Sequence, residues 1–394
     1  MLASVRTRWI LLGSGLLLVA CSVYDESLLE PASGGGGSGG GGSQSRCEHA
    51  SYPDPPSETN LGGDIEFTVA MASLSFGDPH GVSLGLKHHR EIGFDLDMTC
   101  TGQGEGPSCV IPEWATANDK TDGVGGRDNS VGALIAQIQA MIPEFGSATY
   151  NSVVDQGQTT VLFNIRGYNG QPNDDRIEAS LYVAAPFDSL EPGAKPQWDG
   201  SDVWPIASDS LADGASATSP KYFDPHGYVR DGVLVASLPE ASLRLPNALL
   251  DGNAGSMNLK LVGAFLAGKL VEVDAAGGKR WELQDVHLAG RWPTDDLVKQ
   301  LSQFPEPSNL SMPLCMDSSN YEVFRNLLCS FTDIYAGIAS PTSVCNAISF
   351  GVHLETRPAY LGDVVEVEPP ASDRCPAETD PVQDACGKPI PSFK

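Results

Sequence analysis

Residues 161–183, VLFNIRGYNGQPNDDRIEASLYV, decide the fold class of this 394-residue chain. Apolar and polar side chains alternate along residues 161–166 and again along residues 177–183, with the two-residue period of a strand that buries one face. The segment between them is rich in Asn, Gly, Pro and Asp, the residues that favour turns. The stretch therefore predicts an antiparallel hairpin with a long tip.

Half-buried patterns of the same kind predict further strands at residues 65–71, 232–238, 259–265, 270–273, 281–288 and 348–355. Helical stripes are fewer, and we expect helices at residues 131–142, at residues 321–335 and shortly after residue 293. The helices fall between runs of strands without a regular βαβ alternation. We therefore expect a mainly β protein, an antiparallel sandwich or jelly-roll-like body with two or three peripheral helices, stapled by disulfides.

Composition divides the chain into four parts. Residues 1–20 are apolar behind two arginines, and residues 21–46 end in the run GGGGSGGGGS. The strand patterns occupy residues 47–190 and 191–394, which we expect to be two β-rich domains or halves. Residues 186–227 are rich in Pro, Gly, Asp and Ser, and we expect them to separate two sheets or subdomains.

The sequence Leu18-Val19-Ala20-Cys21 ends an apolar run that is too short to cross a bilayer as a stable helix. Arg6 and Arg8 precede this run, as in an export signal. With its cysteine, the sequence resembles the lipobox of bacterial lipoproteins. The resemblance covers residues 1–43 and implies that residues 1–20 are removed and that the Cys21 thiol carries a lipid. Beyond it, the chain resembles β-rich surface lipoproteins in general style only.

The same resemblance implies a location. Ser22 follows the cysteine where an Asp would imply retention at the inner membrane, so we expect an outer-membrane protein, facing the periplasm or the surface. Glycine and serine bury little apolar area, so residues 21–46 should form a flexible tether. Roughly 25 residues of such a coil span about 25–30 Å, enough to hold a folded domain clear of the lipid headgroups. The run is also identical to a laboratory linker.

The formal net charge of −26 makes nucleic acid an unfavourable partner, because a polyanion repels a phosphate backbone. Besides Cys21 the chain has eight cysteines, and an even number behind an export signal predicts four disulfides in an oxidising compartment. We expect Cys100 to pair with Cys109 and Cys375 with Cys386, since each pair closes a short loop. The eight are Cys47, Cys100, Cys109, Cys315, Cys329, Cys345, Cys375 and Cys386.

Carboxylates and amides gather between residues 95 and 129, among several glycines. Calcium needs six to eight oxygen ligands on a tightly bending backbone, so these residues are candidates for a structural Ca²⁺ site. The segment resembles the calcium loops of thrombospondin type 3 and dockerin repeats without their strict spacing. The alternative is a surface turn that caps the following helix. The candidate ligands are Asp95, Asp97, Asp119, Asp122, Asp128 and Asn129.

A second candidate site lies in residues 198–205, WDGSDVWP. Trp198 and Trp204 could stack on a sugar ring while Asp199 and Asp202 bond its hydroxyl groups. The alternative is that both tryptophans anchor a loop onto the sheet.

No P-loop, dinucleotide-binding fingerprint or spaced catalytic carboxylate pair is found in the sequence. We therefore expect a non-catalytic binding or structural role at the cell envelope, with a glycan or a protein as the ligand. Two alternatives stay open. One is a secreted hydrolase of polysaccharide or peptide whose carboxylates are distant in sequence, and the other is an assembly partner of an outer-membrane complex.

Replacing Cys21 tests the lipid anchor. We expect the full chain to partition with membranes and detergent, and the Cys21→Ser variant to move to the soluble fraction, because serine lacks the thiol that the lipid needs. Cell fractionation with detergent phase separation measures this, and Ser22→Ala is the matched control that keeps the thiol. A Cys21→Ser variant that still partitions wholly with membranes contradicts lipidation at this residue.

Overall fold

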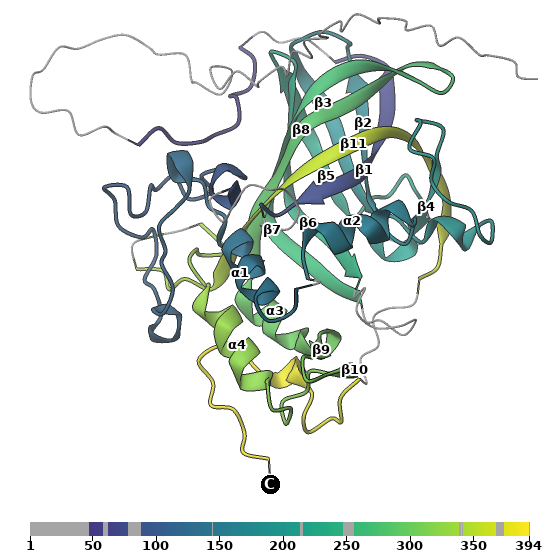
Figure 1. Ribbon diagram of the computed structural model, residues 1–394. Coiled ribbons are helices and arrows are strands. Elements are labelled where there is room, and N and C mark those ends of the chain that lie inside the picture. The colour runs from purple at the N-terminus through teal and green to yellow at the C-terminus, as the bar shows by residue number, and fades with distance from the viewer. Residues whose placement is uncertain are drawn as a thin grey trace, which may run out of the picture. The chain divides into compact units, whose positions relative to one another are not determined.

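The structure is a computed structural model that describes residues 47–57, 62–77, 88–143, 145–212, 216–246, 256–338, 340, 342–367 and 374–393. Eight antiparallel strands follow one another around a closed barrel, and the last of them, β11, returns to pair with the first, β1 (Figure 1). In order around the barrel they are β1 (Ile65–Ser75), β2 (Val161–Tyr168), β3 (Asp174–Val183), β5 (Tyr222–Arg230), β6 (Val233–Pro246), β7 (Ser256–Ala275), β8 (Gly278–Pro293) and β11 (Ala347–Val365).

The expected mainly β class is confirmed, and the expected sandwich or jelly roll is wrong, because the sheet closes on itself. Alternation along one strand shows that one face is buried, and it does not show which strands become neighbours. The predicted hairpin is β2 and β3, paired from Val161 opposite Val183 to Arg166 opposite Glu178. The strands expected at residues 259–265 and 270–273 are one strand, β7, whose pairing with β8 shifts at a bulge after Ala267.

Apolar side chains fill the interior of the barrel. Along β7, for example, Leu259, Leu261, Ala264 and Leu266 are buried in the same core. That core is continuous from β1 to β11 and includes side chains from the helices. Strands from both sides of residue 190 build the one sheet, so residues 47–190 and 191–394 are two parts of a single barrel.

Within the described residues, four α-helices and a hairpin lie toward one end of the barrel (Figure 1). Asn129 caps α1 by accepting the Gly132 N–H, as the sequence predicts for this group of residues. The short α2 was not expected, because its sequence SATYNSVVD has only a weak apolar stripe. The elements are α1 (Ser130–Gln139), α2 (Ser147–Asp155), α3 (Thr294–Lys299), α4 (Tyr321–Ser330), β9 (Pro305–Glu306) and β10 (Asn309–Pro313).

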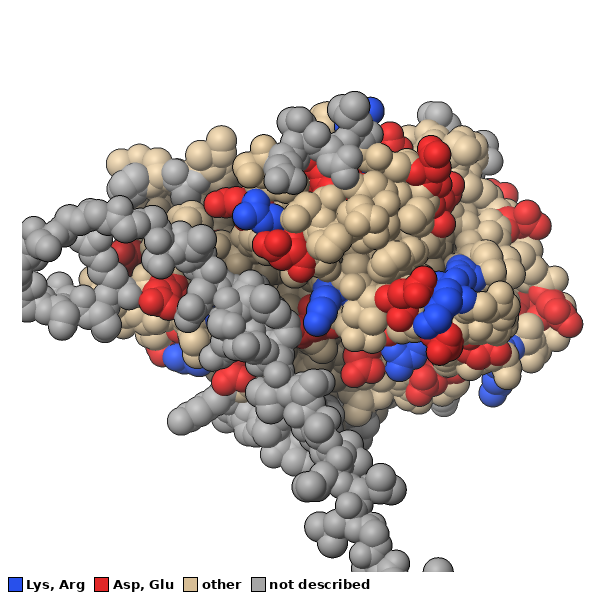
Figure 2. Space-filling view, turned by 90° about the horizontal axis from the view of Figure 1, so that it is seen from above, with Lys and Arg blue, Asp and Glu red and all other residues tan. Residues whose placement is uncertain are grey.

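Two segments cover parts of the outer face of the barrel. One contains β4 (Val203–Ala207), which runs parallel to the end of β11 and lies within residues 186–227, the segment expected to separate two sheets or subdomains. The other is residues 47–57, where Tyr52 stacks on Phe265 of β7 and meets the edge of Phe94. Acidic side chains are spread over the face shown in Figure 2 rather than gathered in one place.

The described residues contain four disulfides, the number expected, but the two expected pairings are wrong. The bonds join Cys47 to Cys100, Cys109 to Cys345, Cys315 to Cys375 and Cys329 to Cys386. Cys109 is drawn away from Cys100 because Val110 forms a parallel bridge with Val344, beside Cys345. Proximity in the sequence therefore does not predict which cysteines pair. Three of the bonds join cysteines 53, 57 and 60 residues apart, and the fourth joins cysteines 236 residues apart.

Among the described residues, no helix has the length and apolar character that crossing a membrane requires. The predicted signal segment 1–20, Cys21 and the tether 21–46 lie outside the described residues.

Removing a core side chain tests the closed barrel. Phe350 on β11 is fully buried, so we expect Phe350→Ala to lower the free energy of unfolding by about 3–5 kcal/mol. Urea unfolding followed by fluorescence measures this. Val323, 55% exposed on α4, gives the matched control Val323→Ala, which should change the value little. An equal effect of the two variants contradicts the placement of Phe350.

Candidate metal centre

Residues 88–129 form an irregular region beside the barrel, with the short 3₁₀ helices η2 (His88–Glu91), η3 (Glu113–Ala115) and η4 (Val124–Gly126). We call it the acidic lobe, and it is drawn in blue in Figure 1. Disulfides fix it at Cys100 and Cys109, and the Asp95 N–H donates to the Ala50 carbonyl at 2.8 Å. Its shape therefore depends on tertiary links, because it has little regular secondary structure.

Asp95, Asp97 and Asp128 converge inside the acidic lobe. One carboxylate oxygen from each lies within 4.8 Å of the others. The Asp95 side chain is 0% exposed, and Asp128 is 3% exposed. Like charges this close and this buried are unfavourable unless protons, cations or hydrogen bonds compensate them.

Hydrogen bonds hold these carboxylates in place. Asp97 accepts the Ser108 hydroxyl at 2.5 Å, and Asp128 accepts the Leu96 N–H at 2.6 Å. Asp122 accepts the Thr101 N–H at 2.5 Å.

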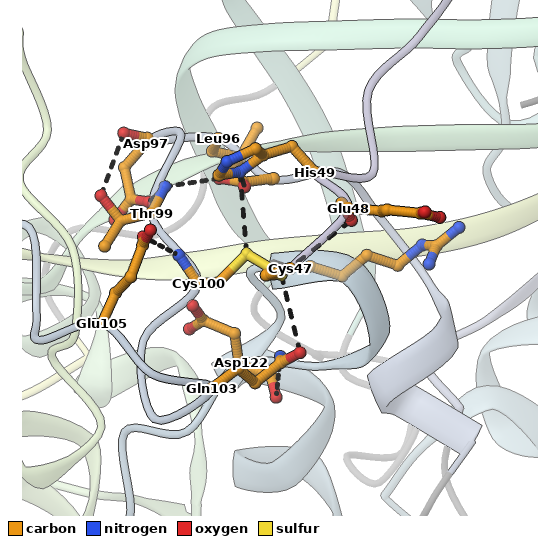
Figure 3. A network of polar contacts seen from close by, with 12 residues as sticks. Cys47, Glu48, His49, Leu96, Asp97, Thr99, Cys100, Gln103, Glu105 and Asp122 are labelled. Carbon is orange, nitrogen blue, oxygen red and sulfur yellow. Dashed lines mark hydrogen bonds and ion pairs between the residues drawn. A yellow bond between two sulfur atoms is a disulfide. The ribbon is translucent and has the colours of Figure 1, made fainter. Parts of the chain in front are cut away.

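Figure 3 shows how the lobe surrounds its disulfide. Asp97, Asp122 and Glu105 lie around the bond between Cys47 and Cys100, and Glu105 accepts the Cys100 N–H at 2.9 Å. The lobe thus presents several carboxylates to one small volume.

Burial raises the pKa of Asp95, Asp97 and Asp128, and the charges of neighbouring carboxylates add to the effect at Asp95 and Asp128. For Asp122, burial raises the pKa to about 8, with the charges of Asp97 and Asp333 contributing. At neutral pH, Asp122 therefore keeps a proton that an exposed carboxyl group would have lost.

The basic groups that these carboxylates face are few. His49 Nδ1 lies 2.5 Å from an Asp95 oxygen, the Arg291 guanidinium donates to the Leu96 carbonyl, and the charge of Lys120 acts on Asp333. Asp95, Asp97, Asp122, Asp128 and Asp333 thus outnumber these three basic groups, so bound protons or a cation would reduce the repulsion among the carboxylates.

The structure brings together three of the six candidate calcium ligands, Asp95, Asp97 and Asp128, and the charge of Asp122 acts on Asp128. Asp119 is exposed and pairs with Arg90 at 3.4 Å, apart from the others. Asn129 has the capping role that the alternative assigns to it, since its side chain accepts the N–H groups of Gly132 and Gly351.

Sequence reasoning did not identify Asp333, His49 or Glu105. Asp333 is more than 200 residues from the lobe and reaches it through Ser130 and Ser349, whose hydroxyls it accepts at 2.6 and 2.5 Å. No local pattern could have signalled this contact.

The oxygen-rich donor set suits a hard cation better than a thiophilic one. Cys100 Sγ lies 3.7 Å from His49 Nδ1, but it is bonded to Cys47 and offers no thiolate. The carboxylates of Asp95, Asp97, Asp122 and Asp128 remain as donors, and calcium is the common biological cation that tolerates such an irregular set.

The tryptophan segment has a different geometry. Trp204 is 0% exposed and packs against Phe187 and Trp198, so it has no free ring face for a sugar. Asp202 accepts the N–H groups of Gln197 and Trp198, and Asp199 is exposed in a turn with Ser201. This arrangement fits the alternative, a loop anchored on the barrel by its aromatic residues.

The raised pKa of Asp122 predicts a pH dependence. The folded chain keeps this proton up to about pH 8, whereas the unfolded chain loses it near pH 4. The stabilisation is therefore complete below about pH 4 and is lost as the pH rises through 8. In chelator, we expect the Tm of the wild type to fall across this range and Asp122→Asn to lose part of that fall.

Thermal unfolding at several pH values measures this effect. Asparagine keeps the acceptor for the Thr101 N–H, and Asp119→Asn is the matched control at an exposed carboxylate. If Asp122→Asn keeps the full pH dependence of the wild type, the titrating group lies elsewhere.

Comparison with protein-family models, with curated proteins and with solved structures finds no match to this chain.

Proposed function

We propose that this chain is a lipid-anchored, non-catalytic protein of the bacterial outer membrane that binds a structural Ca²⁺ in its acidic lobe. The observation that carries the calcium site is the convergence of Asp95, Asp97 and Asp128 within 4.8 Å, with Asp95 and Asp128 buried and Asp97 partly buried. A cation at this position removes the repulsion and the need for raised pKa values together.

The ligand set would consist of the three converging carboxylates and Asp122, whose charge acts on Asp128. Calcium takes six to eight oxygens, so carbonyl groups of the lobe and water would complete its shell. Magnesium demands a regular octahedron at shorter distances, which this irregular lobe is less suited to supply. Calcium binding would then stabilise a region that has little secondary structure of its own.

The disulfides and the N-terminal sequence support the proposed location. Four disulfides in one chain are typical of proteins that fold in an oxidising compartment. The resemblance to the lipobox and the glycine-rich tether supply the membrane attachment.

A binding role is favoured over hydrolysis. Asp95, one of the converging carboxylates, has a side chain that is 0% exposed, so a polymer substrate could not reach it. The remaining candidate partners are an envelope glycan, a protein ligand or an outer-membrane complex.

Calcium should raise the thermal stability of the wild-type chain. By mass action, free calcium at 100 times the Kd adds about 2.7 kcal/mol to the free energy of unfolding. We expect Asp128→Asn to lose this response, because the variant keeps the shape and the acceptor for the Leu96 N–H but lacks the charge.

Thermal unfolding in calcium and in chelator measures the response, with Asp119→Asn as the control that should respond like the wild type. A wild-type Tm that calcium and chelator leave unchanged contradicts the calcium site. The lipid anchor has its own test in the partitioning of Cys21→Ser, so the two parts of the proposal can fail separately.

A further inference from the structure

A second group of ligating side chains lies on the outer face of the barrel. His287 on β8 and His353 on β11 are direct partners in the ladder between these strands. Asp285 lies two residues before His287, in the bulge where the pairing of β8 with β7 shifts, and its carboxylate contacts both histidines. The alternate residues Val286, Leu288 and the neighbours of His353 are fully buried in the core, which places the histidines and Asp285 on the outside.

The three side chains converge. Asp285 Oδ1 lies 3.0 Å from His353 Nε2 and 3.7 Å from His287 Nε2. All three ligand atoms lie within 4.8 Å of one another, and the imidazole rings meet edge to face with centroids 5.4 Å apart. Between 22% and 35% of each side chain is exposed, so a solvated ion can reach the group.

We propose that Asp285, His287 and His353 bind Zn²⁺, with water in the remaining coordination position. Two imidazoles and a carboxylate are donors that zinc accepts, and zinc sites with three protein ligands keep an open fourth position. Ligands about 2.0–2.1 Å from a tetrahedral ion stand about 3.4 Å apart. The distances from Asp285 Oδ1 to His353 Nε2 and His287 Nε2, 3.0 and 3.7 Å, lie just below and just above this value.

The backbone supports the same conclusion. Asp285 has a φ of 50° and lies in the bulge of β8, where Asp285 and Val286 both face Gly268 of β7. Bulges of this kind change the direction of a side chain, and here the carboxylate contacts both histidines.

Gly93 gives the site a link to the acidic lobe. Its N–H donates to His287 Nδ1 at 3.2 Å, so the metal-free imidazole carries its proton on Nε2. Zinc binds the Nε2 lone pair, so the imidazole must change to the tautomer that carries its proton on Nδ1. The ring loses one proton at Nε2, gains one at Nδ1 and stays neutral. The Gly93 N–H then faces a donor, and zinc binding must break this hydrogen bond.

Calorimetric titration of the full chain with Zn²⁺, in saturating calcium, tests the site. We expect one equivalent to bind, and His353→Gln and Asp285→Asn to weaken binding at least tenfold. His226→Gln, which changes an exposed histidine on β5, is the matched control and should bind as the wild type does. Thermal unfolding without zinc shows that each variant is folded.

Three outcomes overturn the proposal. They are a wild type that binds no zinc at millimolar concentration, unchanged binding by folded His353→Gln and Asp285→Asn, and loss of binding in His49→Gln alone, which would place the ion in the acidic lobe. The proposal does not rest on the calcium site, because calcium is present in every titration.

Hydrogen exchange gives a second readout. We expect zinc to speed exchange at the Gly93 amide, since its acceptor is lost. Zinc binding with unchanged protection at Gly93 shows that His287 keeps its hydrogen bond, and it contradicts the three-residue site.

Discussion

The pairing of β1 with β11 is the constraint on which the rest of this structure depends. Without it the eight strands would form an open sheet with two exposed edges and one apolar face uncovered. With it, the side chains of all eight strands meet in one interior, and the helices need only cover an end. The 19 residues of β11 also pair with β8 and β4, so one strand fixes three neighbours.

The same strand positions both proposed metal sites. Ser349 binds Asp333 and Gly351 binds Asn129, and these contacts hold the start of α1 and one side of the acidic lobe against the barrel. Two residues further along, His353 faces His287 on the outer surface. The lobe has little secondary structure, so its carboxylates can converge only because the rigid sheet supplies a frame.

The local features of the fold could be predicted from the sequence. Alternation identified the hairpin of β2 and β3, and the polar residues before Val131 marked the start of α1. Three of the six candidate calcium ligands, Asp95, Asp97 and Asp128, converge because they are close in sequence and share one irregular segment. Features that depend on distant contacts could not be derived in this way. Closure of the barrel, the partner of Cys109, and the approach of Asp333 to the lobe each join segments more than 200 residues apart.

The bond between Cys47 and Cys100 has a mechanical consequence. If Cys21 is fixed in a membrane, any pull on the tether enters the folded part of the chain at Cys47 and passes through the disulfide to Cys100. From Cys100 the force passes along nine residues of backbone to Cys109. The disulfide from Cys109 then carries it to Cys345, two residues before β11 begins. The force therefore reaches the barrel along a largely covalent path, and residues 47–57 are not peeled from its surface. Reduction of either disulfide would reroute the load through hydrogen bonds, which yield at far lower force.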